Sequence, residues 1–144
     1  MEALNLGDQT ASFDRATTEF AYASLEGGDA DRCGCDPCRN FGLQRTIAYP
    51  PDFLALLDRL GIDSLKEGEA VHYGEDSSGK HNYGGWFYFI GTMEVAGEYQ
   101  IERDGFSYWI GTSFPQPPPP FRHKPVLALE FMTRLPWLLA DPHE

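Results

Sequence analysis

Three cysteines, all that the 144-residue chain contains, stand within six positions as Cys33, Cys35 and Cys38. Thiolates bind zinc and other soft metals, and two thiols three residues apart can also form a redox pair. The presence of Cys33 distinguishes these two interpretations, because a redox pair needs only two sulfurs and would leave the third thiol without a role. Three crowded thiolates repel one another unless a cation neutralises them. The pattern therefore favours a metal site, with zinc as the metal.

A closed zinc site takes four ligands, and the chain has no second cysteine pair to supply the fourth. The remaining ligand must be a distant residue or water. His81, at the start of an aromatic stretch, is the preferred histidine, and His72 is the second choice. His123 and His143 are weaker candidates, since one lies beside a proline run and the other near the end of the chain. The predicted ligand set is Cys33, Cys35, Cys38 and His81.

The residues around these cysteines indicate the start of a helix. Asp36 is predicted as its N-cap and Pro37 as its first residue, where the missing N–H costs nothing. Cys38 then lies in the first turn, where unpaired backbone N–H groups and the helix dipole favour a thiolate. Arg32 and Arg39 act in the same direction, so we expect Cys38 to have the lowest thiol pKa.

Two further segments precede the main strands. Residues 17–24, TTEFAYAS, alternate in the period-two pattern of a half-buried strand. The segment YPPDFLALLDRLGID predicts a helix that begins at Pro51 and ends at Gly61. Its apolar face consists of Phe53, Leu54, Leu56, Leu57 and Leu60.

From Glu69 onward the sequence predicts strands: EAVHYGE, HNYGGWFYFIGTMEV, then EYQIERDGFSYWIGTSF with a turn at Asp104 and Gly105, and PVLALEFMT. WFYFI has bulky apolar residues on both faces, which indicates a central strand. Residues 113–121, SFPQPPPPF, predict a rigid polyproline connection.

Together these patterns predict a single α+β domain over residues 1–144. Its expected parts are a cysteine loop and helices at residues 32–62, a mainly β meander at residues 69–133, and the proline-rich connection at residues 113–121. We expect an antiparallel sheet of about five or six strands with one or two helices packed on it.

Composition narrows the class of protein. The formal net charge of −11 is opposite to that of nucleic-acid binders, so no DNA or RNA partner is expected, while an acidic face could bind a basic protein. The first twenty residues lack the features of a signal peptide, and no apolar run approaches the length of a membrane span. Few and odd-numbered cysteines fit a reducing compartment, which predicts a cytoplasmic protein without membrane contact.

The segments CGCDPCRNF, YPPDFLALLDRLGID and HNYGGWFYFIG together resemble a family of small uncharacterised bacterial proteins. That family carries a Cys-x-Cys-x-x-Cys-Arg-Asn-Phe motif and a Tyr-Gly-Gly-Trp-Phe strand. The resemblance spans Cys33 to Ile90 and implies a bacterial origin and a shared architecture, with no activity to transfer.

The sequence thus predicts a zinc-stabilised binding or regulatory module with a possible protein partner. No complete catalytic motif is present, which favours a non-enzymatic protein. Two alternatives stay open. One is a thiol-redox or metal-dependent enzyme that uses the Cys35 and Cys38 region, because CDPC resembles the redox centre of thioredoxin-like proteins. The other is an acidic immunity-type protein that binds a basic protein partner.

Overall fold

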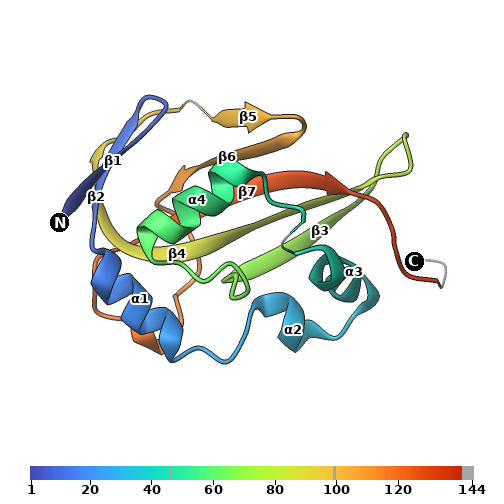
Figure 1. Cartoon of the computed structure of the whole chain (residues 1–144), viewed down its shortest axis with the longest axis horizontal. Coiled ribbons are helices and arrows are strands. Elements are labelled where there is room, and N and C mark those ends of the chain that lie inside the picture. Colours follow the sequence, from blue (N-terminus) through green and yellow to red (C-terminus); the bar gives the residue numbers. More distant parts are fainter. Residues whose placement is uncertain (46, 99, 141–144) are drawn as a thin grey trace.

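A computed structural model describes residues 1–45, 47–98 and 100–140 of the chain. Within these ranges, four α-helices pack on one seven-stranded antiparallel sheet (Figure 1). The α+β prediction is confirmed, although the sheet has one strand more than the larger number expected and there are four helices instead of one or two.

The sheet is built around one long central strand. The strand order is β1-β2-β4-β7-β6-β5. The remaining strand, β3, pairs with the first part of β4, and β2 pairs with the last part of β4 along the same edge. The strands are β1 (Glu2–Leu6), β2 (Gln9–Phe13), β3 (Glu69–Glu75), β4 (His81–Val95), β5 (Ile101–Arg103), β6 (Phe106–Gly111) and β7 (Val126–Leu135). The central place of β4 confirms what its apolar pattern predicted.

The predicted meander is wrong in one respect, because β7 lies between β4 and β6. β5 is only three residues long, whereas β7 pairs with β4 over ten residues, from His81↔Leu135 to Ile90↔Val126. The proline-rich connection, which contains the short 3₁₀-helix η1 (Pro119–Phe121), leads the chain from the end of β6 to β7, which pairs with the edge of β4 opposite β2 and β3.

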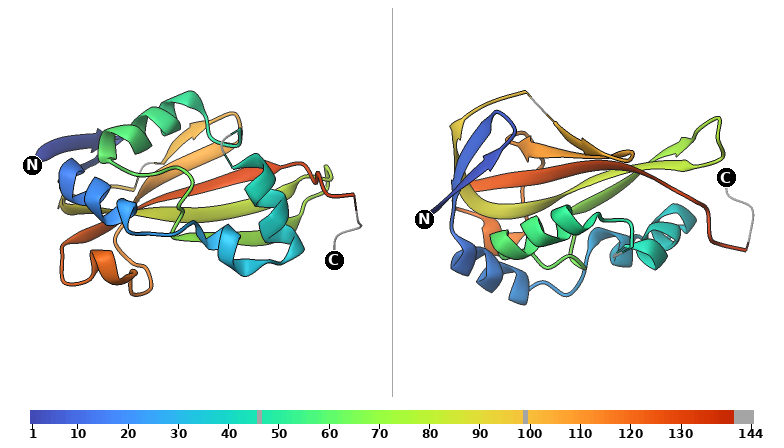
Figure 2. Two further views of the ribbon diagram at one scale, coloured as in Figure 1. Left: turned by 60° about the horizontal axis from the view of Figure 1, so that its bottom comes forward. Right: turned by 45° about the horizontal axis from the view of Figure 1, so that its top comes forward.

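The helices lie together on one side of the sheet (Figure 2). They are α1 (Arg15–Ala23), α2 (Asp29–Cys33), α3 (Asp36–Gln44) and α4 (Pro51–Leu60). The predicted limits of α4 are confirmed: Pro51 is its first residue, and Gly61 ends it with φ 81°. A side chain at Gly61 would also meet the carbonyl oxygen of Arg15, so glycine is required there twice over.

The strand predicted at residues 17–24 is wrong, since this segment lies in α1 and its C-cap. The Asp14 side chain accepts hydrogen bonds from the backbone N–H and hydroxyl of Thr17 and so starts the helix. Phe20, which the alternating pattern placed on the buried face, is 82% exposed. The buried residues follow helical spacing instead, as Thr18, Ala21 and Tyr22.

An aromatic core joins the helices to the sheet. Its rings come from α3, α4, the loop between them, β4, β6 and β7, with neighbouring centroids 4.8 to 6.4 Å apart. Aromatic pairs at such separations contribute beyond the area that they bury. The core thus fixes on the sheet α3, which contains Cys38 and has Cys35 as its N-cap. Its members are Phe41, Tyr49, Phe53, Phe87, Phe106 and Phe131.

Candidate metal centre

The three thiols converge where α2 ends and α3 begins. Cys33 is the last residue of α2, Cys35 is the N-cap of α3, and Cys38 lies in the first turn of α3. Their sulfur atoms all lie within 4.8 Å of one another, and the Cys33 and Cys35 sulfurs are 3.0 Å apart. Among the described residues, this is the one group of three or more possible metal ligands at such short range.

The turn between the two helices is what brings Cys33 back to the other thiols. Gly34 has φ 76°, a left-handed conformation that L side chains adopt at a cost, and no atom lies within 4 Å of where its Cβ would be. Glycine is therefore required here by backbone conformation and not by space. The left-handed turn at Gly34 thus lets the chain fold back and present a third sulfur.

The helix start lies one residue earlier than the sequence indicated. Cys35 is the N-cap, Asp36 is the first helical residue, and the Cys35 carbonyl accepts the backbone N–H of Arg39. Cys38 still lies in the first turn, as predicted. With Cys35 as the N-cap, Cys35 and Cys38 are separated by the first turn of α3, and the three-residue spacing lets their sulfurs approach.

The expected order of thiol acidity is wrong. Cys38 is buried, and burial raises its pKa because the thiolate loses its hydration. The Cys33 thiol is exposed, and hydrogen bonds from the thiols of Cys35 and Cys38 stabilise its thiolate and lower its pKa. The desolvation of Cys38 outweighs the helix dipole on which the sequence prediction relied.

Two anchors hold the cysteine region against the sheet, and the first is Tyr83 on β4. Its hydroxyl donates to the carbonyl oxygen of Pro37 at 2.7 Å, within the first turn of α3. Buried Asn40 donates to the same hydroxyl at 3.3 Å and to the carbonyl of Pro136 at 3.1 Å. These bonds tie the peptide between Cys35 and Cys38 to both the sheet and the segment after β7.

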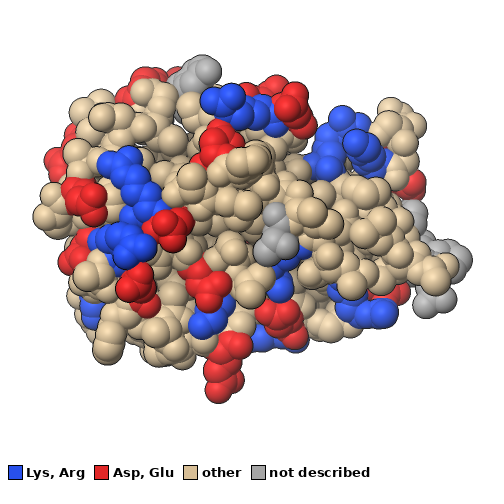
Figure 3. All heavy atoms as spheres, viewed as in Figure 1, with Lys and Arg blue, Asp and Glu red and all other residues tan. Residues whose placement is uncertain are grey.

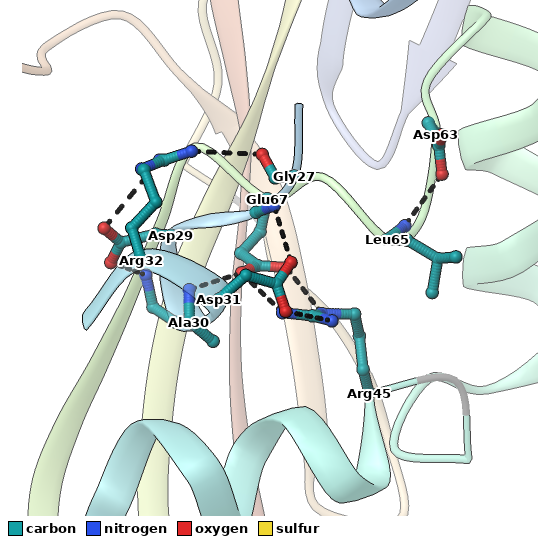
Figure 4. Close-up of polar contacts among 11 residues, drawn as sticks. Gly27, Asp29, Ala30, Asp31, Arg32, Arg45, Asp63, Leu65 and Glu67 are labelled. Carbon is teal, nitrogen blue, oxygen red and sulfur yellow. Dashed lines mark hydrogen bonds and ion pairs between the residues drawn. The ribbon is translucent and has the colours of Figure 1, made fainter. Parts of the chain in front are cut away.

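The second anchor is a buried ion pair beside α2 (Figure 4). Glu67 is 1% exposed and Arg45 is 7% exposed, and their two hydrogen bonds measure 2.8 and 3.1 Å. The Glu67 carboxylate also accepts the backbone N–H of Ala30 at 2.8 Å, in the first turn of α2. Asp31 adds a longer contact to Arg45. The pair therefore fixes the short helix that ends at Cys33.

Neither anchor could be predicted from the sequence. Glu67 and Arg45 are 22 positions apart in segments that show no periodic pattern, so nothing local indicates that they meet. Tyr83 belongs to the quoted Tyr-Gly-Gly-Trp-Phe stretch, but its alternation predicts only a buried ring, not the hydrogen bond to Pro37.

A cavity of about 480 Å³ opens beside the sulfurs, between α2, α3 and β3. The described residues that line it include two carboxylates, Asp29 and Glu69, and no lysine or arginine. Burial, together with the neighbouring charge of Asp29, raises the pKa of Glu69. Such a lining attracts a cation. The other wall residues are Cys33, Cys35, Pro37, Cys38, Phe41, Ala70, Val71, His72 and Tyr83.

The histidines are placed differently from the order expected. His72, the second choice, lines the cavity of the cysteines, whereas His81, the first choice, is fully buried behind it and does not. Neither has a ring nitrogen within 4.8 Å of all three sulfurs. His123 lines a different cavity, beside the proline-rich connection. His143 lies outside the described residues.

The measured sulfur separations are close to what a metal requires. Tetrahedral zinc with bonds of about 2.3 Å holds its sulfurs about 3.8 Å apart. This value falls between the 3.0 Å of the closest pair and the 4.8 Å limit of the group. Adjustments of about an ångström would fit the three thiolates to one ion, and the cluster can therefore hold a metal.

Comparisons of the chain with protein-family models, curated proteins and solved structures find no match. Among the described helices, none combines the length and apolar character needed to cross a membrane.

Proposed function

We propose that this protein is a small zinc-stabilised binding or regulatory module of the cytoplasm. The observation that carries the proposal is the convergence of three thiols within 4.8 Å of one another, beside a cavity lined by carboxylates. Zinc favours thiolate and imidazole ligands and binds four of them in structural sites. A reducing compartment keeps the thiols available for it.

Zinc at this position would act as a cross-link. Cys33 belongs to α2 and Cys38 to α3, so one ion bonded to both would lock the angle between two short helices. α2 has only five residues, which is too short to be stable by itself. Binding energy at a structural zinc site is folding energy for the segments that supply the ligands. The metal would thus order this corner of the molecule.

Elemental analysis of the purified full chain, with thiols titrated before and after chelation, tests the proposal. One zinc per chain and masked thiols that become reactive after chelation are the expected results. Each Cys→Ser variant should lose the zinc, whereas Glu69→Gln, which alters the same cavity without removing a thiol, should retain it. A metal-free protein with three freely reactive thiols, also after incubation with zinc, would refute the proposal.

The short contact between the Cys33 and Cys35 sulfurs favours a second candidate function, in thiol redox chemistry. At 3.0 Å the two exposed thiols are the closest pair, in place of the Cys35 and Cys38 pair that the sequence predicted. The lowered pKa of Cys33 would make it the attacking thiolate. It would attack a small disulfide and release one thiolate, and Cys35 would then displace the second. The products are a Cys33–Cys35 disulfide and two reduced thiols.

Incubation with oxidised glutathione followed by peptide mapping distinguishes this candidate. A Cys33–Cys35 disulfide that forms in the zinc-free protein, and that thioredoxin reduces, would support redox chemistry. Stable mixed disulfides without ring closure would exclude it. The control is Cys38→Ser, which leaves the reacting pair intact.

A basic protein partner has less support. On the face shown in Figure 3, acidic and basic side chains alternate, so this face offers no continuous acidic surface. Several acidic side chains of the described residues are in ion pairs, such as Glu19 with Arg15 at 2.9 Å. Charge that is spread and paired in this way favours solubility over the capture of a basic partner.

A further inference from the structure

His72 lies at the boundary between the cysteine cavity and a group of buried rings. It is on β3, and in the strand register it stands opposite Tyr83, whose hydroxyl donates to Pro37 between Cys35 and Cys38. The ring centroids of His72 and Tyr83 are 5.1 Å apart. Tyr83 thus links the cysteine loop to the strand beside His72, and the imidazole and the three thiols line the same cavity.

His81 contacts the His72 ring through a nitrogen–nitrogen contact and ring stacking. The Nε2 atom of His72 lies 2.8 Å from Nδ1 of His81, and the two rings are stacked with centroids 5.1 Å apart. Trp137 packs on His81 at 4.8 Å, and the segment that carries it is tied to α3 through Asn40, which accepts the backbone N–H of Leu138. His72 is therefore an oriented imidazole at the cavity wall.

We propose that His72 is the fourth ligand of the metal, bound through Nδ1, and that His81 is its positioning residue. The inference rests on the proposed zinc function and adds to it the ligand that completes the site. A metal-bound imidazole donates its other N–H to an outer partner, which fixes its tautomer and raises its basicity. Nε2 of His72 would donate to Nδ1 of His81 in this way, so the pair already has the arrangement of a ligand and its support.

The carboxylates of the cavity fit this position less well. Asp29 accepts the backbone N–H of Ala70 at 3.0 Å and also pairs with Arg32, so it serves to hold α2 to β3. Glu69 lies on the same strand, but a carboxylate oxygen is a harder ligand than an imidazole and suits a site with three thiolates less well. Three thiolates and one imidazole are also a common donor set for structural zinc.

Metal binding would draw His72 and the sulfurs closer together, because neither ring nitrogen of His72 is within 4.8 Å of all three sulfurs. The cysteine turn has the freedom to close. Cys33 and Cys35 are exposed, and the turn between them is a glycine with open space around it.

X-ray absorption at the zinc edge of the zinc-loaded full chain tests the inference. We expect about three sulfurs at 2.3 Å and one nitrogen at about 2.0 Å with imidazole scattering. His72→Gln should lose the imidazole signal and keep the sulfurs, and the matched variant His123→Gln should keep both. His81→Gln should keep the imidazole but weaken zinc binding roughly 10- to 100-fold, as the loss of an outer partner does.

The outcomes separate this inference from the proposed function. Three sulfurs without imidazole in the unaltered chain, or an imidazole that survives His72→Gln, would overturn the role of His72 and leave the cysteine site standing. A spectrum without sulfur ligands would overturn both. If His72→Gln does not fold, the spectrum of the unaltered chain is the test: imidazole scattering supports a histidine ligand, and its absence overturns the role of His72.

Discussion

Replacing Glu67 by Gln should destabilise the protein strongly, although the chemical change is small. Glutamine keeps the shape of the side chain but removes the charge and turns an N–H₂ group toward the Arg45 guanidinium. Arg45 would then be a buried cation without its buried counter-charge, left with a neutral amide oxygen, the longer contact to Asp31 at 3.3 Å and the Phe41 ring at 6.0 Å. Breaking a buried ion pair from one side costs about 3–5 kcal/mol, because the remaining charge stays desolvated.

This loss is large compared with the total stability of a single domain. A folded domain is typically stable by about 5–15 kcal/mol, so the variant should lose roughly a fifth of this stability or more. For a chain of this length the midpoint of thermal unfolding should fall by roughly 10 °C. Urea unfolding of the metal-free protein, followed by far-UV circular dichroism at pH 7, measures the free energy directly.

Asp31→Asn is the matched control. Asp31 contacts the same guanidinium, but its side chain is 50% exposed, so the change should cost under about 1 kcal/mol. Equal losses in the two variants, or a loss below about 1 kcal/mol for Glu67→Gln, would refute the view that the buried pair anchors α2. The reasoning would also fail if zinc binding were unaffected in a Glu67→Gln protein that is strongly destabilised.

Three further predictions concern individual groups. In the metal-free protein, iodoacetamide should modify Cys33 first and Cys38 last, because the Cys33 pKa is lowered and Cys38 is buried with a raised pKa. Mass spectrometry over time gives the order of modification. Early modification of Cys38 would contradict the prediction. Asn40→Ala should reduce the free energy of unfolding by about 2–3 kcal/mol, since it leaves buried partners unpaired. An unchanged urea midpoint would argue against the hydrogen bonds of Asn40 with Tyr83, Pro136 and Leu138. The folded-state pKa of Asp14 is lowered by its hydrogen bonds to Thr17, so its stabilisation is full above the ordinary value of 3.8 and is lost as the pH falls through the lowered pKa. The urea midpoints of Asp14→Ala and the unaltered chain should therefore differ at pH 7 and converge at low pH, and a constant difference would contradict the assignment.

Segments with strong local signals could be predicted from the sequence. β3 and β4 have the residue limits that their composition indicated, and the turn at Asp104 and Gly105 has the positive φ angles that this dipeptide favours. The ends of α4 follow from Pro51 and Gly61. In each case the residues that define the element are neighbours in the chain.

Features that depend on distant contacts could not be predicted. The alternation of residues 17–24 predicts a strand, but the side chain of Asp14 starts a helix there. The β1–β2 hairpin, whose buried residues Leu4, Leu6, Ala11 and Phe13 alternate over short strands, was not predicted. The insertion of β7 beside β4 depends on pairing over a long connection. The acidity of the thiols follows from burial, and the positions of His72 at the cavity and of His81 outside it follow from the fold, neither of which spacing reveals.

Titration of the metal-free chain with cobalt(II) under anaerobic conditions tests the central claim most directly. Cobalt takes the place of zinc, and the intensity of the sulfur-to-metal absorption reports the number of bound thiolates. We predict saturation at one cobalt per chain, with the intensity reduced by roughly one third, or with binding lost, in each single Cys→Ser variant. No sulfur-to-metal absorption, or full intensity in any one of the three variants, would contradict a metal site built from Cys33, Cys35 and Cys38.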